Sequence, residues 1–181
     1  MESVLPLRPK KVSIIIVSHE SADDLEQLLP LLTGSVIASL AEIVVIDNAS
    51  GDRTVAVLNR FSKKITIVSN QENLGFATAV NQGIACSSAP YVLLLNPDAR
   101  LTGTGLETLA GYLDTHTDAA AVAPRIEFPD GRIQPSRGSF PSVIRSVIHL
   151  LQLKRLMPDD AAVMNGPLRY LGHLFKQYSP L

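Results

Sequence analysis

The sequence predicts an α/β fold in which a mostly parallel sheet is flanked by helices. Short β-branched or wholly apolar runs, typical of strands buried on both faces, occur at residues 12–17, 42–47 and 91–95. Between these runs lie segments whose apolar side chains recur at helical spacing. Strands that alternate with helices need right-handed crossovers, and such crossovers produce a parallel sheet.

The expected elements follow one another along the whole first part of the chain. The expected strands are residues 12–17, 42–47, 65–68, 91–95 and 119–123, and the expected helices lie after Ser21, from Asp52, from Phe76 and after Thr104. Ser21 has the pattern of a capping-box start, and Val55, Leu58 and Phe61 are expected on one side of the second helix. Pro129-Asp130-Gly131 predicts a hairpin.

Composition limits the class of protein. The chain has 181 residues, enough for one domain with a packed core, and 46% hydrophobic against 18% charged residues excludes general disorder. A formal charge of −1 gives no basic field for nucleic-acid binding. The single cysteine, Cys86, cannot form an internal disulfide, and no run resembles a signal peptide or a membrane span. We therefore expect a cytoplasmic location.

Polar side chains follow three of the predicted strands, and these define the candidate site. The first strand ends in Ser18-His19-Glu20, the second in Asp47-Asn48, and the central one in Asn96-Pro97-Asp98. Carboxyl ends of parallel strands are where ligands bind, so Asp98 is expected at the mouth of a crevice, where it could hold Mg²⁺ or Mn²⁺ beside phosphates. The alternative for Asp98 is a simple turn.

Two further residues of these strand ends also have two interpretations. Asp47 could accept a hydrogen bond from a base N–H or a ribose hydroxyl, or could form an Asx turn. His19 could contact the ligand or could be a structural or exposed histidine. Neither GxGxxG after the first strand nor GxxxxGK[ST] occurs, so a nucleotide must be held in another way.

The segment from Asn73 to Gly83 has an unusual composition for a helix start. Gly75 permits close approach of the backbone to a ligand, and the small residues Ala77 and Ala79 allow the helix to lie tightly against its neighbours. Asn81 is a poor helix former, which suggests a hydrogen bond either to a substrate or to the loop that carries Asp98.

Four ordered motifs resemble the family 2 glycosyltransferases with a GT-A (Rossmann-like) fold, and in particular their rhamnosyltransferase-like branch. These motifs are Val-Ser-His-Glu-Ser-Ala-Asp-Asp-Leu, Val-Val-Ile-Asp-Asn-Ala-Ser-Gly-Asp, Asn-Leu-Gly-Phe-Ala-x-Ala-x-Asn-x-Gly and Leu-Leu-Asn-Pro-Asp-Ala. The stretch from Pro124 to Ser136 also fits, and the resemblance covers residues 11–141. Together the four motifs are specific, although each alone would be weak.

The resemblance implies transfer of a sugar from a nucleotide-diphosphate-sugar donor to a saccharide or lipid-linked acceptor, as in cell-surface polysaccharide synthesis. It implies a divalent metal, Mg²⁺ or Mn²⁺, at an Asp-x-Asp element whose last carboxylate is Asp98. The residues implied in donor binding are Ser18, His19, Glu20, Asp47, Asn73, Gly75, Asn81, Asn96 and Asp98.

This sequence departs from the family pattern in three places. Asn96 replaces the first carboxylate of the metal element, and His19-Glu20 stands where the family often has Tyr-Asn. The chain has no tryptophan and ends at Leu181, before the acceptor half that carries the general base in the family. Asp159 and Asp160 are expected to be solvated loop residues, so the catalytic base is unknown and residues 1–181 alone are expected not to transfer sugar.

These expectations divide the chain into an N-terminal tail (1–10), a nucleotide-sugar-binding domain (11–140) and an amphipathic helical tail (141–181). The apolar face of residues 143–156 could pack on the sheet, pair with a second copy, or contact the inner face of a membrane. The alternative function is an inactive module that binds a nucleotide sugar or acts by oligomerisation. A nucleotidyltransferase has less support, because the sequence shows no Gly-rich start with a following Arg and Lys.

Overall fold

The computed structural model describes residues 10–128, 130–134 and 174–176. These fall into two compact units. The first contains residues 10–122 together with 174–176, and the second contains the described part of 123–134. The expected N-terminal tail, the helix at 143–156 and the residues Asp159 and Asp160 lie outside the described residues, apart from Lys10.

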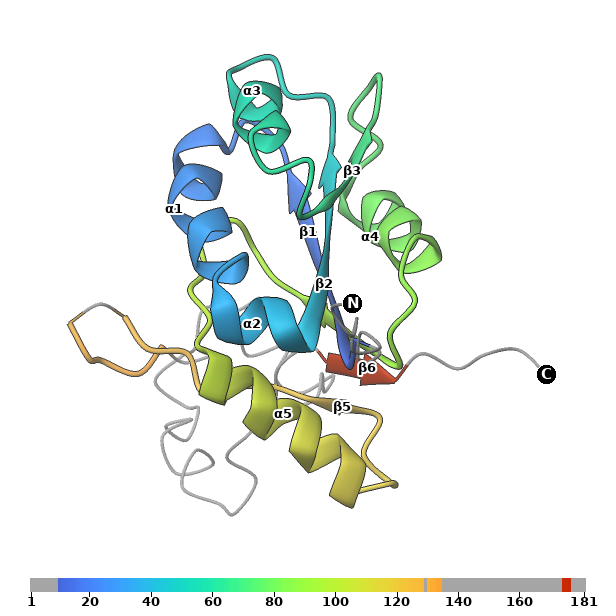
Figure 1. The fold of residues 1–181 in the computed structure, drawn as a ribbon, viewed down its shortest axis with the longest axis vertical. Helices are drawn as coiled ribbons and strands as arrows, with labels where there is room; N and C mark the ends of the chain where they lie inside the picture. Colours follow the sequence, from blue (N-terminus) through green and yellow to red (C-terminus); the bar gives the residue numbers. More distant parts are fainter. Residues whose placement is uncertain (1–9, 129, 135–173, 177–181) are drawn as a thin grey trace, which may run out of the picture. The chain divides into compact units, whose positions relative to one another are not determined.

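The first unit contains six strands and five helices in its described part. The strands are β1 (Val12–Ser18), β2 (Ala41–Asp47), β3 (Thr66–Ser69), β4 (Tyr91–Leu94), β5 (Ala121–Val122) and β6 (Leu174–Lys176). The helices are α1 (Ala22–Leu32), α2 (Ser35–Leu40), α3 (Thr54–Asn59), α4 (Phe76–Ala85) and α5 (Gly103–Thr115). Figure 1 shows α1 and α3 on one side of the strands β1 and β2, with α4 on the other side.

The sheet has the order β3-β2-β1-β4-β6-β5, and its first four strands are parallel. This confirms the mostly parallel sheet. The strand expected at 119–123 is shorter, and it pairs antiparallel with β6, which also pairs antiparallel with β4. The short β6 has no apolar run of strand length, so pairing with β4 and β5 was not visible as a pattern in the sequence.

Alternate residues of the central strands contribute to two cores, as the period of a strand requires. Ile14 and Ile16 of β1, with Ile43 and Val45 of β2, belong to the larger core, which includes the buried leucines of α1 and α5. The smaller core on the opposite face contains the next residues along β2, Val44 and Ile46, with Ala79 of α4. The strands are therefore apolar on both faces because each face is covered.

Helix α4 lies close to the sheet at a residue that the sequence did not single out. A Cβ atom placed on Gly83 would lie only 2.5 Å from Cγ2 of Ile15, which is 1% exposed in β1. Ala79 is fully buried as expected, whereas Ala77 is exposed and takes no part in the packing. Gly83, about two turns after the helix start, permits this close approach together with the buried Ala79.

Several helix boundaries differ from the expectations. Ser21 precedes α1, but its hydroxyl donates to the carbonyl of His19 and forms no cap bond. Helix α5 begins two residues earlier than expected, because Thr102 rather than Thr104 accepts the hydrogen bond of a first-turn amide. Helix α2 was not predicted, since its six residues are too few for a periodic pattern.

The face of α3 also differs from the expectation. The helix is shorter than residues 52–61, and its buried residues are Thr54, Val57 and Leu58. Val55 is exposed, so its assignment to the packed side was wrong. The short helix is held to α1 by polar groups, described below, and this reduces the apolar signal that periodicity can detect.

The described part of the second unit forms the predicted hairpin. Glu127 and Ile133 make an antiparallel bridge, and the amide of Phe128 donates to the carbonyl of Arg132 at 2.8 Å. Gly131 has a φ of +82°, the left-handed conformation that glycine adopts without strain at such a turn.

Within the described ranges, no helix has the length and hydropathy needed to cross a membrane.

Candidate functional site

The strand order places a topological switch point between β1 and β4. From β1 the chain moves outward to β2 and β3, whereas β4 returns to pair with the other side of β1. In open parallel sheets, ligands bind outside the carboxyl ends of the strands at such a reversal. The residues after β1 (His19 and Glu20) and after β4 (Asn96 to Asp98) lie on the two sides of this point.

Asp47 is the last residue of β2 and pairs in register with Ser18 at the end of β1. Its side chain is 2% exposed, and Oδ1 is the one buried side-chain oxygen or nitrogen of the described residues that has no hydrogen-bond partner. A buried acceptor without a donor costs about 1–3 kcal/mol, and more when it is charged. The end of β2 therefore carries an acceptor that a ligand N–H or O–H could satisfy.

The loops after β1 and β2 are joined by direct contacts. Nδ1 of His19 lies 3.0 Å from the carbonyl oxygen of Asn48, and the amide of Glu20 donates to Oγ of Ser50 at 2.9 Å. Because a carbonyl only accepts, Nδ1 of His19 carries the proton in this contact. Glu20 and Ala49 both have positive φ, at 51° and 63°. Such conformations are costly for residues other than glycine and concentrate at functional sites.

The loop after β3 joins the other two through side-chain amides. Asn48, 3% exposed, accepts from the side chain of Asn70 at 3.1 Å and from the amide of Leu74 at 3.0 Å. Its own Nδ2 donates to Oδ1 of Asn73 at 2.7 Å. Gly75, with a φ of +78°, precedes α4, and its amide donates to the same Oδ1 at 3.0 Å. The ends of β1, β2 and β3 therefore form one hydrogen-bonded platform.

Asp98 lies beyond β4 in a turn closed by the amide of Ala99, which donates to the carbonyl of Asn96 at 3.1 Å. Asp98 is exposed, and its carboxylate makes no hydrogen bond or ion pair with a described residue. No group of three or more His, Cys, Asp or Glu side chains with metal-ligand geometry occurs in the described part of the chain. A lone exposed carboxylate fits Mg²⁺ or Mn²⁺ bound mainly through substrate phosphates, but does not fit a closed protein cage.

A hollow beside the start of α1 is a poor candidate for the phosphates. It is lined by Glu20, Ser21, Ala22, Asp23, Asp24, Asp52 and Arg53. Four of these side chains are carboxylates and one is a guanidinium, so the local charge opposes an anionic ligand. The switch point, with the free acceptor of Asp47 on one side and Asp98 on the other, is the better candidate.

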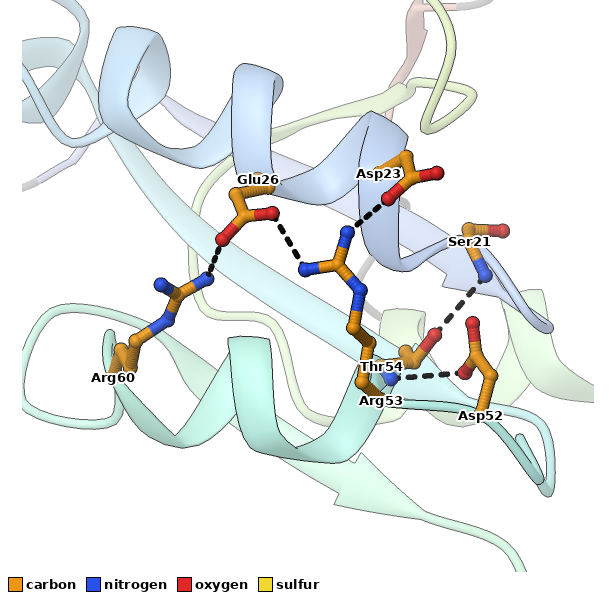
Figure 2. A network of polar contacts seen from close by, with 7 residues as sticks. All are labelled: Ser21, Asp23, Glu26, Asp52, Arg53, Thr54 and Arg60. Carbon is orange, nitrogen blue, oxygen red and sulfur yellow. Dashed lines mark hydrogen bonds and ion pairs between the residues drawn. The ribbon is translucent and has the colours of Figure 1, made fainter.

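A network of polar side chains joins α1 to α3 (Figure 2). Its members are Ser21, Asp23, Glu26, Asp52, Arg53, Thr54 and Arg60. Arg53 contacts Asp23 and donates to Glu26 at 2.7 Å, and Arg60 also pairs with Glu26. Hydrogen bonds from Arg60 and then Arg53 lower the pKa of Glu26. The charged side chains of this network are largely exposed, so their ion pairs contribute little to stability and serve mainly to orient α1 and α3.

The buried member of this network is Thr54, which fixes the loop after β1. Its Oγ1 accepts from the amide of Ser21 at 3.0 Å, and its own amide donates to Oδ1 of Asp52 at 2.9 Å. The side-chain and backbone hydrogen bonds of Thr54 lower the pKa of Asp52. The loop that carries His19 and Glu20 is thus held from α3 as well as from β2.

Two expected site residues are placed differently from the rest. Ser18 is completely buried, and its hydroxyl donates to the carbonyl of Ile46 at 3.4 Å. Asn81 is exposed on α4 and makes no side-chain hydrogen bond to a described residue, so the suggested tie to the Asp98 loop is not seen. Gln82, one residue further, instead pairs reciprocally with Asn70 at 2.9 and 3.0 Å.

Comparison with known proteins identifies the family. The family model described as "Glycosyl transferase family 2" matches residues 13–170. This chain belongs to glycosyl transferase family 2. An N-acetylglucosaminyl-diphospho-decaprenol L-rhamnosyltransferase of Mycobacterium tuberculosis is 27% identical over 160 residues, and an uncharacterized glycosyltransferase of Haemophilus influenzae is 28% identical over 119 residues. The resemblance to the rhamnosyltransferase-like branch of family 2 is confirmed.

Solved structures confirm the GT-A fold of this family 2 chain. Staphylococcus aureus TarS has a TM-score of 0.58 at 22% identity, with 70% of this chain and 38% of that chain covered. The mannosyltransferase PcManGT from Pyrobaculum calidifontis, in complex with GDP-Man and Mn²⁺, has a TM-score of 0.54 at 21% identity, with 71% and 40% covered. At these identities the likeness shows the fold alone.

The chain spans half or less of the length of the two curated relatives reported above. It covers 50% of the Mycobacterium protein, with 82% of this chain aligned, and 36% of the Haemophilus protein, with 64% aligned. Sequence reasoning did not single out Asn70 and Gln82, and it placed Asn48 at a strand end of the candidate site without giving it a role. Asn48 directly follows Asp47, and polar amides after a buried strand were the available signal, but the partners of an amide are set by three-dimensional contacts.

Proposed function

We propose that this chain binds a nucleotide-diphosphate sugar at the switch point between β1 and β4 and that its protein transfers the sugar to a saccharide or lipid-linked acceptor. The pathway we propose is the synthesis of cell-surface polysaccharide. The observation that carries the proposal is Oδ1 of Asp47, buried and without a partner at the carboxyl edge of the sheet. Membership of family 2 supports sugar transfer as the reaction class.

In this proposal the two acidic residues hold opposite ends of the donor. Asp47 accepts a hydrogen bond from the base or the ribose, because its free oxygen can only accept when ionised. Asp98 holds the divalent cation next to the diphosphate, and that cation would neutralise charge on the leaving group. The complex of PcManGT with GDP-Man and Mn²⁺ supports a divalent cation, Mg²⁺ or Mn²⁺, for this chain also.

The other proposed donor-binding residues surround these two. Ser18, His19 and Glu20 would form one side of the base pocket, with Gly75 on the β3 side. Asn73 would act there through its hydrogen bonds to Asn48 and Gly75. Asn81 and Asn96 complete the proposed set. Ser18 would act through its backbone, since its side chain is buried against Ile46. We further propose a cytoplasmic protein, with association through residues 143–156 as a second copy or as a peripheral membrane contact.

Calorimetry with UDP, dTDP and GDP tests the donor site. At least one nucleotide should bind more tightly with Mn²⁺ than with EDTA. Asp98→Ala should remove the difference without lowering the unfolding temperature, because Asp98 is exposed. Asp118→Ala, an exposed carboxylate in the turn after α5, is the matched control and should bind as the wild type does.

A transfer assay separates the enzyme from the alternative of an inactive binding module. Donor binding combined with slow donor hydrolysis and no transfer would favour the module for residues 1–181. Metal-independent binding would remove Asp98 from its assigned role. Failure of all three nucleotides to bind would refute the donor site altogether.

A further inference from the structure

The segment from Asn70 to Gly75 is held in an unusual way. Residues 71–78 are all exposed, so little apolar packing fixes this segment. The backbone amides of Leu74 and Gly75 donate to side-chain oxygens, those of Asn48 and Asn73, and not to backbone carbonyls. The position of the segment therefore depends on two asparagine side chains.

Asn48 connects this segment to both neighbouring loops. Its main-chain amide donates to the carbonyl of Ser18 at 2.8 Å, and its carbonyl accepts from His19 at 3.0 Å. Its side chain makes three hydrogen bonds, two as acceptor and one as donor to Asn73. Both polar atoms of the buried Asn48 side chain thus have partners, which rigidifies the surroundings and makes the loss of a partner costly.

The segment from Asn70 to Gly75 begins next to Asp47 in the sheet. The amide of Asn70 donates to the carbonyl of Asp47 at 2.9 Å, and Ser69 is paired with Asp47 in the sheet. Asp47 is buried and unpartnered at Oδ1, whereas the amides around it are satisfied. The side chains that hold these loops together are neutral amides, those of Asn48, Asn70, Asn73 and Gln82. They can therefore fix the loops without placing a positive charge next to the Asp47 carboxylate.

We propose that Asn48 and Asn73 are positioning residues for the donor nucleotide. They hold the segment 70–75 and the start of α4 against the end of β2, so that Asp47 keeps a free and preorganised acceptor for the ligand. The inference rests on the proposed donor site. It assigns to Asn73 an indirect role, through Asn48 and Gly75, and not a contact with the nucleotide.

The two asparagines differ in what their hydrogen bonds require. Oδ1 of Asn73 accepts from Nδ2 of Asn48 and from the amide of Gly75, so Asn73 needs only an acceptor. Asn48 needs both an acceptor, for the amide of Leu74, and a donor, for Asn73. The backbone donors at Leu74 and Gly75 identify which side-chain atoms are oxygens. Aspartate can therefore replace Asn73 but not Asn48.

Calorimetry with UDP, dTDP and GDP in the presence of Mn²⁺ tests this asymmetry. Asn73→Ala should weaken nucleotide binding about tenfold, as expected for the loss of two hydrogen bonds that affect the ligand only indirectly. Asn73→Asp should remain within about threefold of the wild type, and Asn48→Asp should be weakened about tenfold or more. Asn59→Ala, at the exposed end of α3, is the control and should bind normally.

Two structural readouts accompany the affinities. Asn73→Ala removes the acceptor of the buried Nδ2 of Asn48, so this variant should unfold at a lower temperature than the wild type. Asn73→Asp keeps an acceptor at this position and should unfold at nearly the wild-type temperature. Hydrogen exchange measured by NMR should be faster at Gly75 in Asn73→Ala and retained in Asn73→Asp, since only the first variant lacks its acceptor. Affinities are compared at a temperature where every variant is folded, so that weaker binding by Asn73→Ala reports the position of the segment and not unfolding.

The outcomes distinguish this inference from the donor site itself. If the wild type binds a nucleotide and Asn73→Ala binds it equally tightly, the positioning role is refuted and the donor site stands. Equal weakening in Asn73→Ala and Asn73→Asp would also refute it, because it would indicate direct recognition of the Asn73 amide. If the wild type binds none of the three nucleotides, both proposals fail together.

Discussion

Replacement of Gly83 by alanine should destabilise the protein although alanine is the better helix former. The new Cβ would lie 2.5 Å from Cγ2 of Ile15 and 3.4 Å from its Cγ1 and Cδ1. Ile15 is β-branched, 1% exposed, and paired in the sheet with Val44 and Leu94, so its χ1 has little freedom to change. Either α4 or Ile15 must move.

The magnitude follows from two opposing terms. Overpacking of a core costs about 1–3 kcal/mol, and alanine gains about 1 kcal/mol over glycine within a helix. A contact as short as 2.5 Å places the cost in the upper part of that range, so Gly83→Ala should lose about 1–2 kcal/mol of unfolding free energy. For a chain of this size that corresponds to a fall of about 2–8 °C in unfolding temperature.

A second glycine gives the control. Gly111 lies within α5, where an added Cβ would meet no atom within 4 Å. Gly111→Ala should therefore stabilise by about 0.5–1 kcal/mol. Urea denaturation of both variants measures the contrast, and in an Ile15→Ala background the penalty at Gly83 should largely disappear. A Gly83→Ala protein as stable as Gly111→Ala would refute the close packing of α4.

Substitutions at three other positions test the loops and the opposite edge of the sheet. Thr54→Val should cost about 1–2 kcal/mol in urea denaturation, because the amide of Ser21 loses its acceptor, and Thr54→Ser should cost less. Ala49→Val should destabilise by about 1–2 kcal/mol and Ala49→Gly should not, since φ is 63° there; equal stabilities would contradict the left-handed conformation. At Glu42, burial would raise the pKa, but hydrogen bonds from Ser13, Ser88 and Ala89 together outweigh it and lower the pKa from its ordinary 4.5. The stabilisation from the Glu42 carboxylate is thus complete above about pH 4.5 and is lost as the pH falls through the lower folded-state pKa. Glu42→Gln should flatten the loss of stability in that acidic range, and an unchanged pH profile would exclude the effect.

Much of the fold followed from local patterns. Each central strand is buried on both faces, so its apolar run is continuous and visible in the sequence, as in Val12–Ser18 and Tyr91–Leu94. Alternation with helices then implied the parallel sheet. Asp47 and Asp98 were recognised because carboxylates that follow buried strands are conspicuous, and because four motifs matched one family.

Only the tertiary structure decided which of these groups meet. The order β3-β2-β1-β4 created the switch point, and no local pattern records which side of β1 a later strand will join. Asn48 is hydrogen-bonded to Asn73, and Gly83 packs closely on Ile15, although these residues lie far apart in the chain. The burial of the Asp47 carboxylate likewise depends on segments that are distant in sequence. Sequence therefore determined the central parallel strands, four of the five helices of the described residues and the family, because hydrophobic periodicity and motif spacing are local properties. The structure decided which residues of the candidate site lie together, because hydrogen bonds and close contacts depend on distances between residues that the chain alone does not relate.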